Sequence, residues 1–182
     1  PAADPAALAP VVAAAAAAKI GVVERDPDER DERRVLNLGH TLGHALEAAA
    51  GYRGLRHGEA VAYGLLFALR LAEARGLDAA GPELFARARA LLARLGLPPL
   101  PAGDLDPAAL LELAGRDKKA RESGLVWVLP EATGPRRAGW RPVGGIDPAE
   151  VAGELAAFLA DPFAPRAAVR PGGRRPLYSA RT

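Results

Sequence analysis

The stretch NLGHTLGHALEAAAGY, residues 37–52, decides the fold of this chain, and HGEAVAYGLLFA, residues 57–68, follows it closely. In both stretches apolar residues recur at the three- and four-residue spacing of a helix that buries one face. Extended to either side, this spacing predicts a helix over 28–50, a loop over 51–57 and a strongly apolar helix over 58–76. The sequence therefore predicts a pair of helices joined by a short polar connection.

The remainder of the chain is also predicted to be mostly helical. GLVWVLP at 124–130 is a clear strand pattern, and a weaker partner follows at 138–144, which predicts a small β-hairpin as an appendage to the helical core. The fold class is therefore mainly α, a multi-helix domain with a β-hairpin near 124–144. Further helices are expected at 5–23, 82–95, 107–115 and 148–160.

The domain is expected to span residues 1–160, and the Arg- and Pro-rich residues 161–182 are expected to form a disordered tail. The chain lacks Met at position 1 and throughout, which indicates a segment of a longer protein or a processed product. The alanine run 13–18 has no basic region before it and is too short to span a bilayer. We therefore expect a cytoplasmic protein.

The composition excludes several kinds of site. The chain has no Cys, so disulfides and thiolate metal sites are excluded, and any metal must be held by His and carboxylates. No glycine-rich phosphate loop of the G-x-G-x-x-G or G-x-x-x-x-G-K-[ST] type occurs. The net charge of +2 indicates no particular partner, and neither nucleic acid nor membrane is expected to bind.

All three histidines of the chain lie within 18 residues. His40 and His44 are one helical turn apart, which places their Cβ atoms roughly 5–6 Å from each other on one face. Glu47 extends that face, and the loop residue His57 can fold back against the pair when the next helix runs antiparallel. The spacing favours a metal or catalytic site. The alternative is a satisfied pair of core histidines with a solvated His57.

Gly39 and Gly43 lie inside the predicted helix 28–50. Each costs a helix about 0.5–1 kcal/mol relative to Ala, and together they leave one strip of the helix without side chains. The sequence thus predicts the close approach of either another helix or a ligand at this strip.

The two quoted stretches closely resemble 3-dehydroquinate synthases, and the resemblance extends over about residues 10–160. It implies the C-terminal, metal- and substrate-binding half of such an enzyme. In the family the first His of the motif and the His of HGE bind the metal, which implies His40 and His57 as ligands. Zinc is the expected metal, with cobalt as an alternative. His44 is implied to lie beside the metal and substrate as a catalytic proton relay.

The resemblance also implies residues around the substrate, a keto-acid sugar that carries a carboxylate and a phosphate. The planar fork of Arg33 suits a carboxylate, whereas lysines act as point charges suited to phosphate or hydroxyl groups. Lys118 is favoured over Lys119 for this contact. The implied catalytic residues are Lys19 and Glu29, and the implied substrate-binding residues are Arg33, Asn37, Lys118 and Lys119.

The implied reaction is the NAD-assisted, metal-dependent conversion of 3-deoxy-D-arabino-heptulosonate 7-phosphate to 3-dehydroquinate and phosphate. This is a carbon–oxygen lyase reaction of the shikimate pathway, which leads to the aromatic amino acids. The family's NAD-binding half and its third metal ligand, a carboxylate, lie upstream of everything in this chain. We therefore expect the chain alone to bind metal poorly and to lack synthase activity, with the NAD-binding half, and in some assemblies a second copy, as its partner.

Two alternatives remain open from the sequence. One is a related sugar-phosphate cyclase that makes a cyclitol, because such enzymes share the metal-binding helix. The other is a truncated, inactive metal-binding or interaction domain in which His40, His44 and His57 form a self-contained site. In the synthase reading, Glu47 or Glu59 is a candidate to complete a site with His40 and His57 in place of the missing upstream carboxylate.

Overall fold

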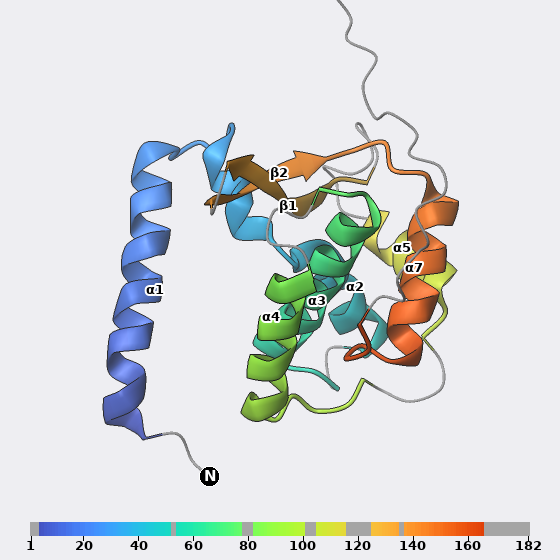
Figure 1. Ribbon diagram of the computed structural model, residues 1–182, viewed down its shortest axis with the longest axis horizontal. Coiled ribbons are helices and arrows are strands. Elements are labelled where there is room, and N and C mark those ends of the chain that lie inside the picture. Colours follow the sequence, from blue (N-terminus) through green and yellow to red (C-terminus); the bar gives the residue numbers. More distant parts are fainter. Residues whose placement is uncertain are drawn as a thin grey trace, which may run out of the picture.

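The computed structural model describes residues 4–51, 54–77, 82–100, 105–115, 125–134 and 137–165. Within these residues the fold is mainly α with one two-stranded sheet, as predicted, and Figure 1 shows the hairpin lying across one end of a group of helices. The elements are α1 (Pro5–Arg25), the 3-10 helix η1 (Glu32–Asn37), α2 (His40–Ala49), α3 (His57–Ala74), α4 (Pro82–Leu95), α5 (Pro107–Gly115), β1 (Trp127–Gly134), β2 (Arg137–Val143) and α7 (Pro148–Ala160).

The α2–α3 pair forms the centre of the molecule. The inner face of α2 buries Leu42 and Leu46, and most of α3 is buried along its length. The ring of Phe67, on α3, lies 5.3 Å from that of Trp127 and 5.4 Å from that of Phe158, both between ring centroids. Such tilted aromatic contacts contribute packing energy beyond the apolar area that they bury. Helix α3 is therefore the element on which α2, α7 and the hairpin are assembled.

The hairpin is confirmed, but its predicted role as an appendage is wrong. Trp127 and Leu129 point to the same face of β1, and both are buried in the main core against α3. The Thr41 hydroxyl donates a hydrogen bond of 3.1 Å to the carbonyl of Val126, which ties α2 to the segment leading into β1. The hairpin thus closes one end of the core.

The predicted helix over 28–50 is interrupted. Gly39 has a left-handed φ of 75°, and it separates η1 from α2. Upstream, the carboxylate of Asp26 accepts hydrogen bonds from the backbone N–H groups of Arg30, Asp31 and Arg33. These bonds stabilise a turn after α1 in place of a regular helix, because they satisfy donors that a helix would use.

His57 is not in the predicted loop, because it is the first residue of α3. The backbone N–H of Arg56 donates to the carboxylate of Glu59 at 2.7 Å, and this bond fixes the helix start one residue earlier than the apolar pattern indicates. His57 is therefore held by a helix terminus.

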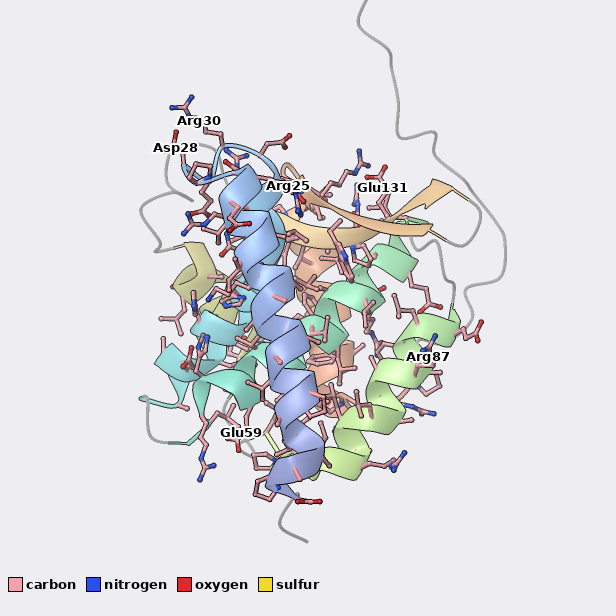
Figure 2. All side chains as sticks on the ribbon, turned by 90° about the vertical axis from the view of Figure 1, so that its left-hand side faces the viewer. Arg25, Asp28, Arg30, Glu59, Arg87 and Glu131 are labelled. Atoms are coloured by element: carbon pink, nitrogen blue, oxygen red, sulfur yellow. The ribbon has the colours of Figure 1, made fainter. Side chains whose placement is uncertain are left out.

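Helix α1 stands to one side of the other helices (Figure 1) and crosses in front of them when viewed from that side (Figure 2). None of its residues is buried, and at its end Arg25 pairs with Glu32 of η1 at 2.7 Å. By length and composition alone, this helix of 21 residues could cross a membrane. Core helices of soluble proteins and signal sequences meet the same criterion. The expectation that the alanine run 13–18 is too short to span a bilayer concerned only part of this helix, which runs from Pro5 to Arg25.

Of the predicted tail 161–182, the structure describes residues 161–165. There Arg89 of α4 donates a hydrogen bond of 3.0 Å to the carbonyl of Phe163, whose ring lies 6.2 Å from that of Tyr63. Residues 166–182 lie outside the described residues.

Candidate metal centre

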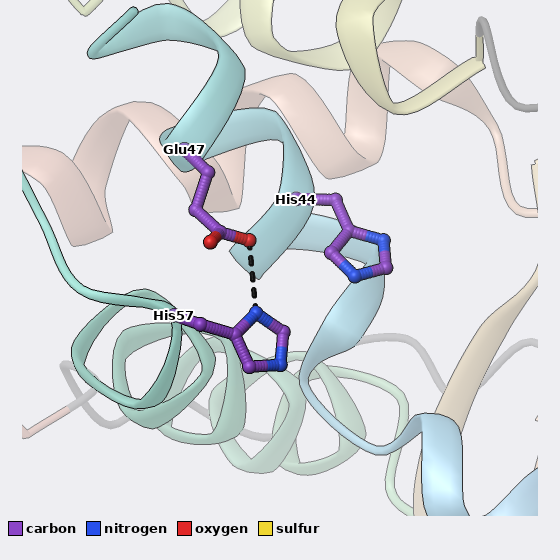
Figure 3. Close-up of side chains that lie close together, drawn as sticks. All are labelled: His44, Glu47 and His57. Carbon is purple, nitrogen blue, oxygen red and sulfur yellow. Dashed lines mark hydrogen bonds and ion pairs between the residues drawn. The ribbon is translucent and has the colours of Figure 1, made fainter. Parts of the chain in front are cut away.

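The three histidines meet where α2 faces the start of α3. The ring centroids are 5.4 Å apart for His40 and His44, 5.4 Å for His40 and His57, and 5.8 Å for His44 and His57. The close-up in Figure 3 shows His44 and Glu47 on α2, with His57 reaching toward Glu47 from α3. The three imidazoles that were predicted to share one place therefore lie together in the fold.

Glycines bring the two helices close enough for this contact. A Cβ atom on Gly43 would lie 3.1 Å from the Cα of Val61 on α3, and a Cβ on Gly64 would overlap the carbonyl oxygen of Gly39. The strip without side chains on α2 is thus filled by the backbone of α3. Of the two alternatives that the sequence left open at Gly39 and Gly43, another helix is the one that approaches.

Two of the three imidazoles have a fixed hydrogen-bond partner at Nδ1. The Nδ1 atom of His40 lies 3.1 Å from the carbonyl oxygen of Leu38, and that of His57 lies 3.0 Å from Oε2 of Glu47. Burial lowers the pKa of His40 below its usual 6.5, the bond to Leu38 partly opposes this, and the neighbouring His44 and His57 lower it further. His40 is therefore held as a neutral base near pH 7, the form that binds metals.

The donor set fits a divalent metal ion. His44, Glu47 and His57 each offer a ligand atom, and these atoms lie within 4.8 Å of one another. Imidazole nitrogens with a carboxylate oxygen are the ligands that zinc takes in catalytic sites. His40 stands outside this trio but its ring touches those of both other histidines. The assignment of His40 and His57 as the ligands remains a prediction.

The segment before α2 brings some of the other predicted site residues together. The side-chain amide of Asn37 donates to the carboxylate of Glu29 at 2.9 Å, and Glu29 has an unusual positive φ of 56°. The guanidinium of Arg33 donates to the carbonyl of Pro27 at 2.6 Å. Lys19 lies on the exposed helix α1.

Lys118 and Lys119 lie outside the described residues, so their predicted contacts with substrate stay predictions. Sequence reasoning missed the role of Asp26 and named Glu47 only as a candidate metal donor. Asp26 follows the end of α1 and precedes Pro27, a position typical of a residue that caps a turn. Glu47 lies three residues after His44, a spacing that placed it on the right face but did not identify His57 as its partner.

Comparison with known proteins agrees with the resemblance that the two histidine-containing stretches show. A family model described as "3-dehydroquinate synthase C-terminal" matches residues 2–120. The 3-dehydroquinate synthase of Symbiobacterium thermophilum is 46% identical over 72% of this chain and 36% of its own length. That of Geobacter metallireducens is 48% identical over 70% of this chain and 34% of its own.

A relative of another name, the 2-epi-valiolone synthase of Actinosynnema mirum, is 44% identical over 68% of this chain and 33% of its own length. The chain spans about a third of the length of the curated relatives it matches. Because the family model covers most of the chain, including the whole of the histidine cluster, the chain belongs to the 3-dehydroquinate synthase C-terminal family.

Proposed function

We propose that this chain is the metal- and substrate-binding part of a cytoplasmic 3-dehydroquinate synthase. The reaction is the conversion of 3-deoxy-D-arabino-heptulosonate 7-phosphate to 3-dehydroquinate and phosphate, on the route to the aromatic amino acids. The observation that carries the proposal is the meeting of His40, His44 and His57 beside Glu47, in a chain of this family.

Arg33 and Asn37 are proposed to bind the substrate. One guanidinium N–H of Arg33 is engaged by Pro27, but the group has five donors, so others remain for a carboxylate. Asn37 is held by Glu29, which fixes its amide and keeps a carboxylate next to it. Lys19 supplies a further cation at the exposed surface. These groups would orient a substrate that carries two anions.

His40 and His57 are the residues proposed to hold zinc, with cobalt as the alternative. When bound, such a metal polarises a hydroxyl or carbonyl oxygen as a Lewis acid. His44 touches both neighbouring rings and is proposed to donate a hydrogen bond to the substrate or to relay its proton. Its exposed position gives a substrate access to the ring.

NAD is proposed to bind to a separate half of the enzyme, because the chain carries no glycine-rich phosphate loop. The exposed apolar surface of helix α1 is the observation that supports such a partner. This helix is apolar around its whole circumference, and Leu8, Val11, Val12 and Ile20 are all exposed. A helix of this composition is normally covered by other protein. The chain alone is therefore expected to lack synthase activity.

The test is reconstitution. The chain is mixed with the N-terminal part of the Symbiobacterium relative, NAD and zinc, and phosphate release from 3-deoxy-D-arabino-heptulosonate 7-phosphate is measured. Release that needs both parts is the expected result. Arg33→Ala should abolish it, whereas the control Arg87→Ala, on the outer face of α4 in Figure 2, should leave it unchanged. Absence of release from the mixture, with the substrate and both proteins intact, would contradict the proposal.

A cyclase that makes a cyclitol is the second candidate, and the 44% identity to the 2-epi-valiolone synthase favours it. Such an enzyme would cyclise a sugar phosphate that has no carboxylate, so Arg33 would lose its proposed role. The discriminating measurement is phosphate release from a heptulose phosphate without a carboxylate, by the reconstituted wild type and by Arg33→Ala. Turnover that survives in Arg33→Ala would favour the cyclitol enzyme.

A further inference from the structure

The two hydrogen bonds at Nδ1 determine where the proton of each imidazole sits. A carbonyl oxygen and a carboxylate only accept hydrogen bonds, so a neutral imidazole that bonds to either must carry its proton on the nitrogen that faces it. His40 faces the Leu38 carbonyl through Nδ1, and His57 faces Glu47 through Nδ1. In both rings Nδ1 is therefore the donor, and Nε2 keeps the lone pair.

We infer that Glu47 is a positioning residue, which holds His57 in the Nδ1–H form so that Nε2 is the atom offered to a metal. The carbonyl of Leu38 does the same for His40. A metal-binding histidine commonly donates its second N–H to a carboxylate or carbonyl, which fixes the ring and makes its free nitrogen more basic. The inference rests on the proposed function only in naming a metal as the group that Nε2 faces.

Burial explains why Glu47 can set the geometry of His57. The side chain of Glu47 is 14% exposed and lies in the last turn of α2, whereas that of His57 is 57% exposed at a helix start. A half-buried carboxylate needs a hydrogen-bond donor, and the ring of His57 supplies one. Glu47 is thus the more buried partner of the pair, and His57 is the more exposed one.

The rival arrangement makes Glu47 itself a ligand, together with His44 and His57. It requires Glu47 to contact the metal, and with Oε2 as the ligand atom the bond to His57 would be weakened or lost. Among the described residues, His44 has no comparable fixed acceptor, and its ring lies against those of His40 and His57. The two arrangements therefore differ in what Glu47→Gln should do, because Gln keeps an acceptor oxygen but is a poor ligand for zinc.

The first experiment reads the tautomers directly, on the metal-free 182-residue chain. Long-range ¹H–¹⁵N correlation spectra of the imidazoles are recorded at about pH 8.5, where an ordinary histidine with pKa near 6.5 is neutral. His57 is expected in the Nδ1–H form in the wild type and in Glu47→Gln, and in a mixture of tautomers in Glu47→Ala. His40, whose acceptor is a backbone carbonyl, should keep its form in all three and serves as the internal reference. An Nε2–H form of His57 in the wild type would overturn the inference.

The second experiment measures the affinity of zinc by competition with a chromophoric chelator, for the chain joined by its complementing half. Glu47→Ala is expected to weaken binding about 10–100-fold, the range typical of groups that orient a ligand, and Glu47→Gln should recover most of the loss. A loss in Glu47→Gln as large as in His57→Ala would show that Glu47 is itself a ligand and would overturn the inference. If the assembly binds no zinc, the proposed function fails, while the tautomer spectra still decide the role of Glu47.

Discussion

The carbonyl oxygen of Gly39 lies directly against the Cα of Gly64, so that a Cβ on Gly64 would overlap it. This contact sets the distance between the start of α2, where His40 lies, and the middle of α3. Gly64→Ala must push the two backbones apart, because neither atom belongs to a flexible side chain. We expect it to destabilise the fold by at least about 2 kcal/mol, as overpacking of a core does, in denaturant unfolding monitored by circular dichroism.

Gly153→Ala is the matched control for this prediction. Gly153 is also a helical glycine, on α7, but a Cβ there meets nothing within 4 Å. The same substitution should therefore stabilise the chain by up to about 1 kcal/mol, the helix propensity of Ala over Gly. Equal effects of the two variants would show that the contact between Gly39 and Gly64 is not tight.

The sequence predicted the helices of the fold well where one face is apolar over several turns. The apolar pattern identified 82–95, 107–115 and 148–160 at the bounds that the structure has for α4, α5 and α7. The same reasoning placed His40 and His44 on one face, because an i,i+4 pair follows from helix geometry alone. Local periodicity is sufficient for this part of the fold and the site.

Local periodicity was insufficient where hydrogen bonds and tertiary contacts determine the structure. The break before α2 depends on the left-handed φ of Gly39, a position where the backbone of α3 leaves no room for a side chain. The core position of Trp127 depends on packing against α3, more than fifty residues earlier. The bond between Glu47 and His57 joins two helices across a connection, which residue spacing cannot predict.

A second prediction concerns the buried ion pair between α3 and α7. The Nε of Arg70 lies 3.3 Å from the carboxylate of Glu154, and the two side chains are 7% and 17% exposed. Glu154→Ala would leave a buried guanidinium without this partner, and we expect a loss of about 3 kcal/mol of unfolding free energy. Arg70→Met combined with Glu154→Leu should recover most of it, because an apolar pair of similar volume removes both charges from the core.

The exposed pair of Arg25 and Glu32 provides the comparison, since these side chains are 60% and 46% exposed. Glu32→Ala should lower the unfolding free energy much less than Glu154→Ala does, because water screens an exposed ion pair. A loss at Glu154 no larger than at Glu32 would contradict the importance of burial. The measurement is denaturant unfolding in the same buffer for all variants.

A third prediction follows from Asp26 and the turn after α1. Backbone N–H groups of Arg33, Arg30 and Asp31 lower the pKa of this carboxyl below its usual 3.8. The unfolded turn therefore takes up a proton at higher pH than the folded one. Its contribution is fully present above the unfolded value of about 3.8 and is lost as the pH falls through the lower folded value.

The amide proton shifts of Arg30 and Arg33, followed by NMR during an acid titration, should report this transition. Both amides should shift together with a midpoint below 3.8. Asp26→Asn should remove the transition while keeping an acceptor oxygen near the turn. A midpoint at or above the usual value would mean that the three backbone bonds do not persist in solution.

The last prediction separates the two possible ligand sets of the metal centre. If His40 and His57 hold zinc, His40→Ala and His57→Ala should each weaken zinc binding by the reconstituted assembly more than about 100-fold, beyond the range for residues that only orient a ligand. His44→Ala should weaken zinc binding by no more than about 100-fold yet abolish phosphate release. The reason is that His44 is proposed to donate a hydrogen bond to the substrate or to relay its proton. If the trio of His44, Glu47 and His57 is the site instead, the order of His40 and His44 is reversed, and the chain alone should bind zinc as tightly as the assembly. That reversed order would favour a self-contained metal-binding domain over half of an enzyme, since every ligand would then come from α2 and α3.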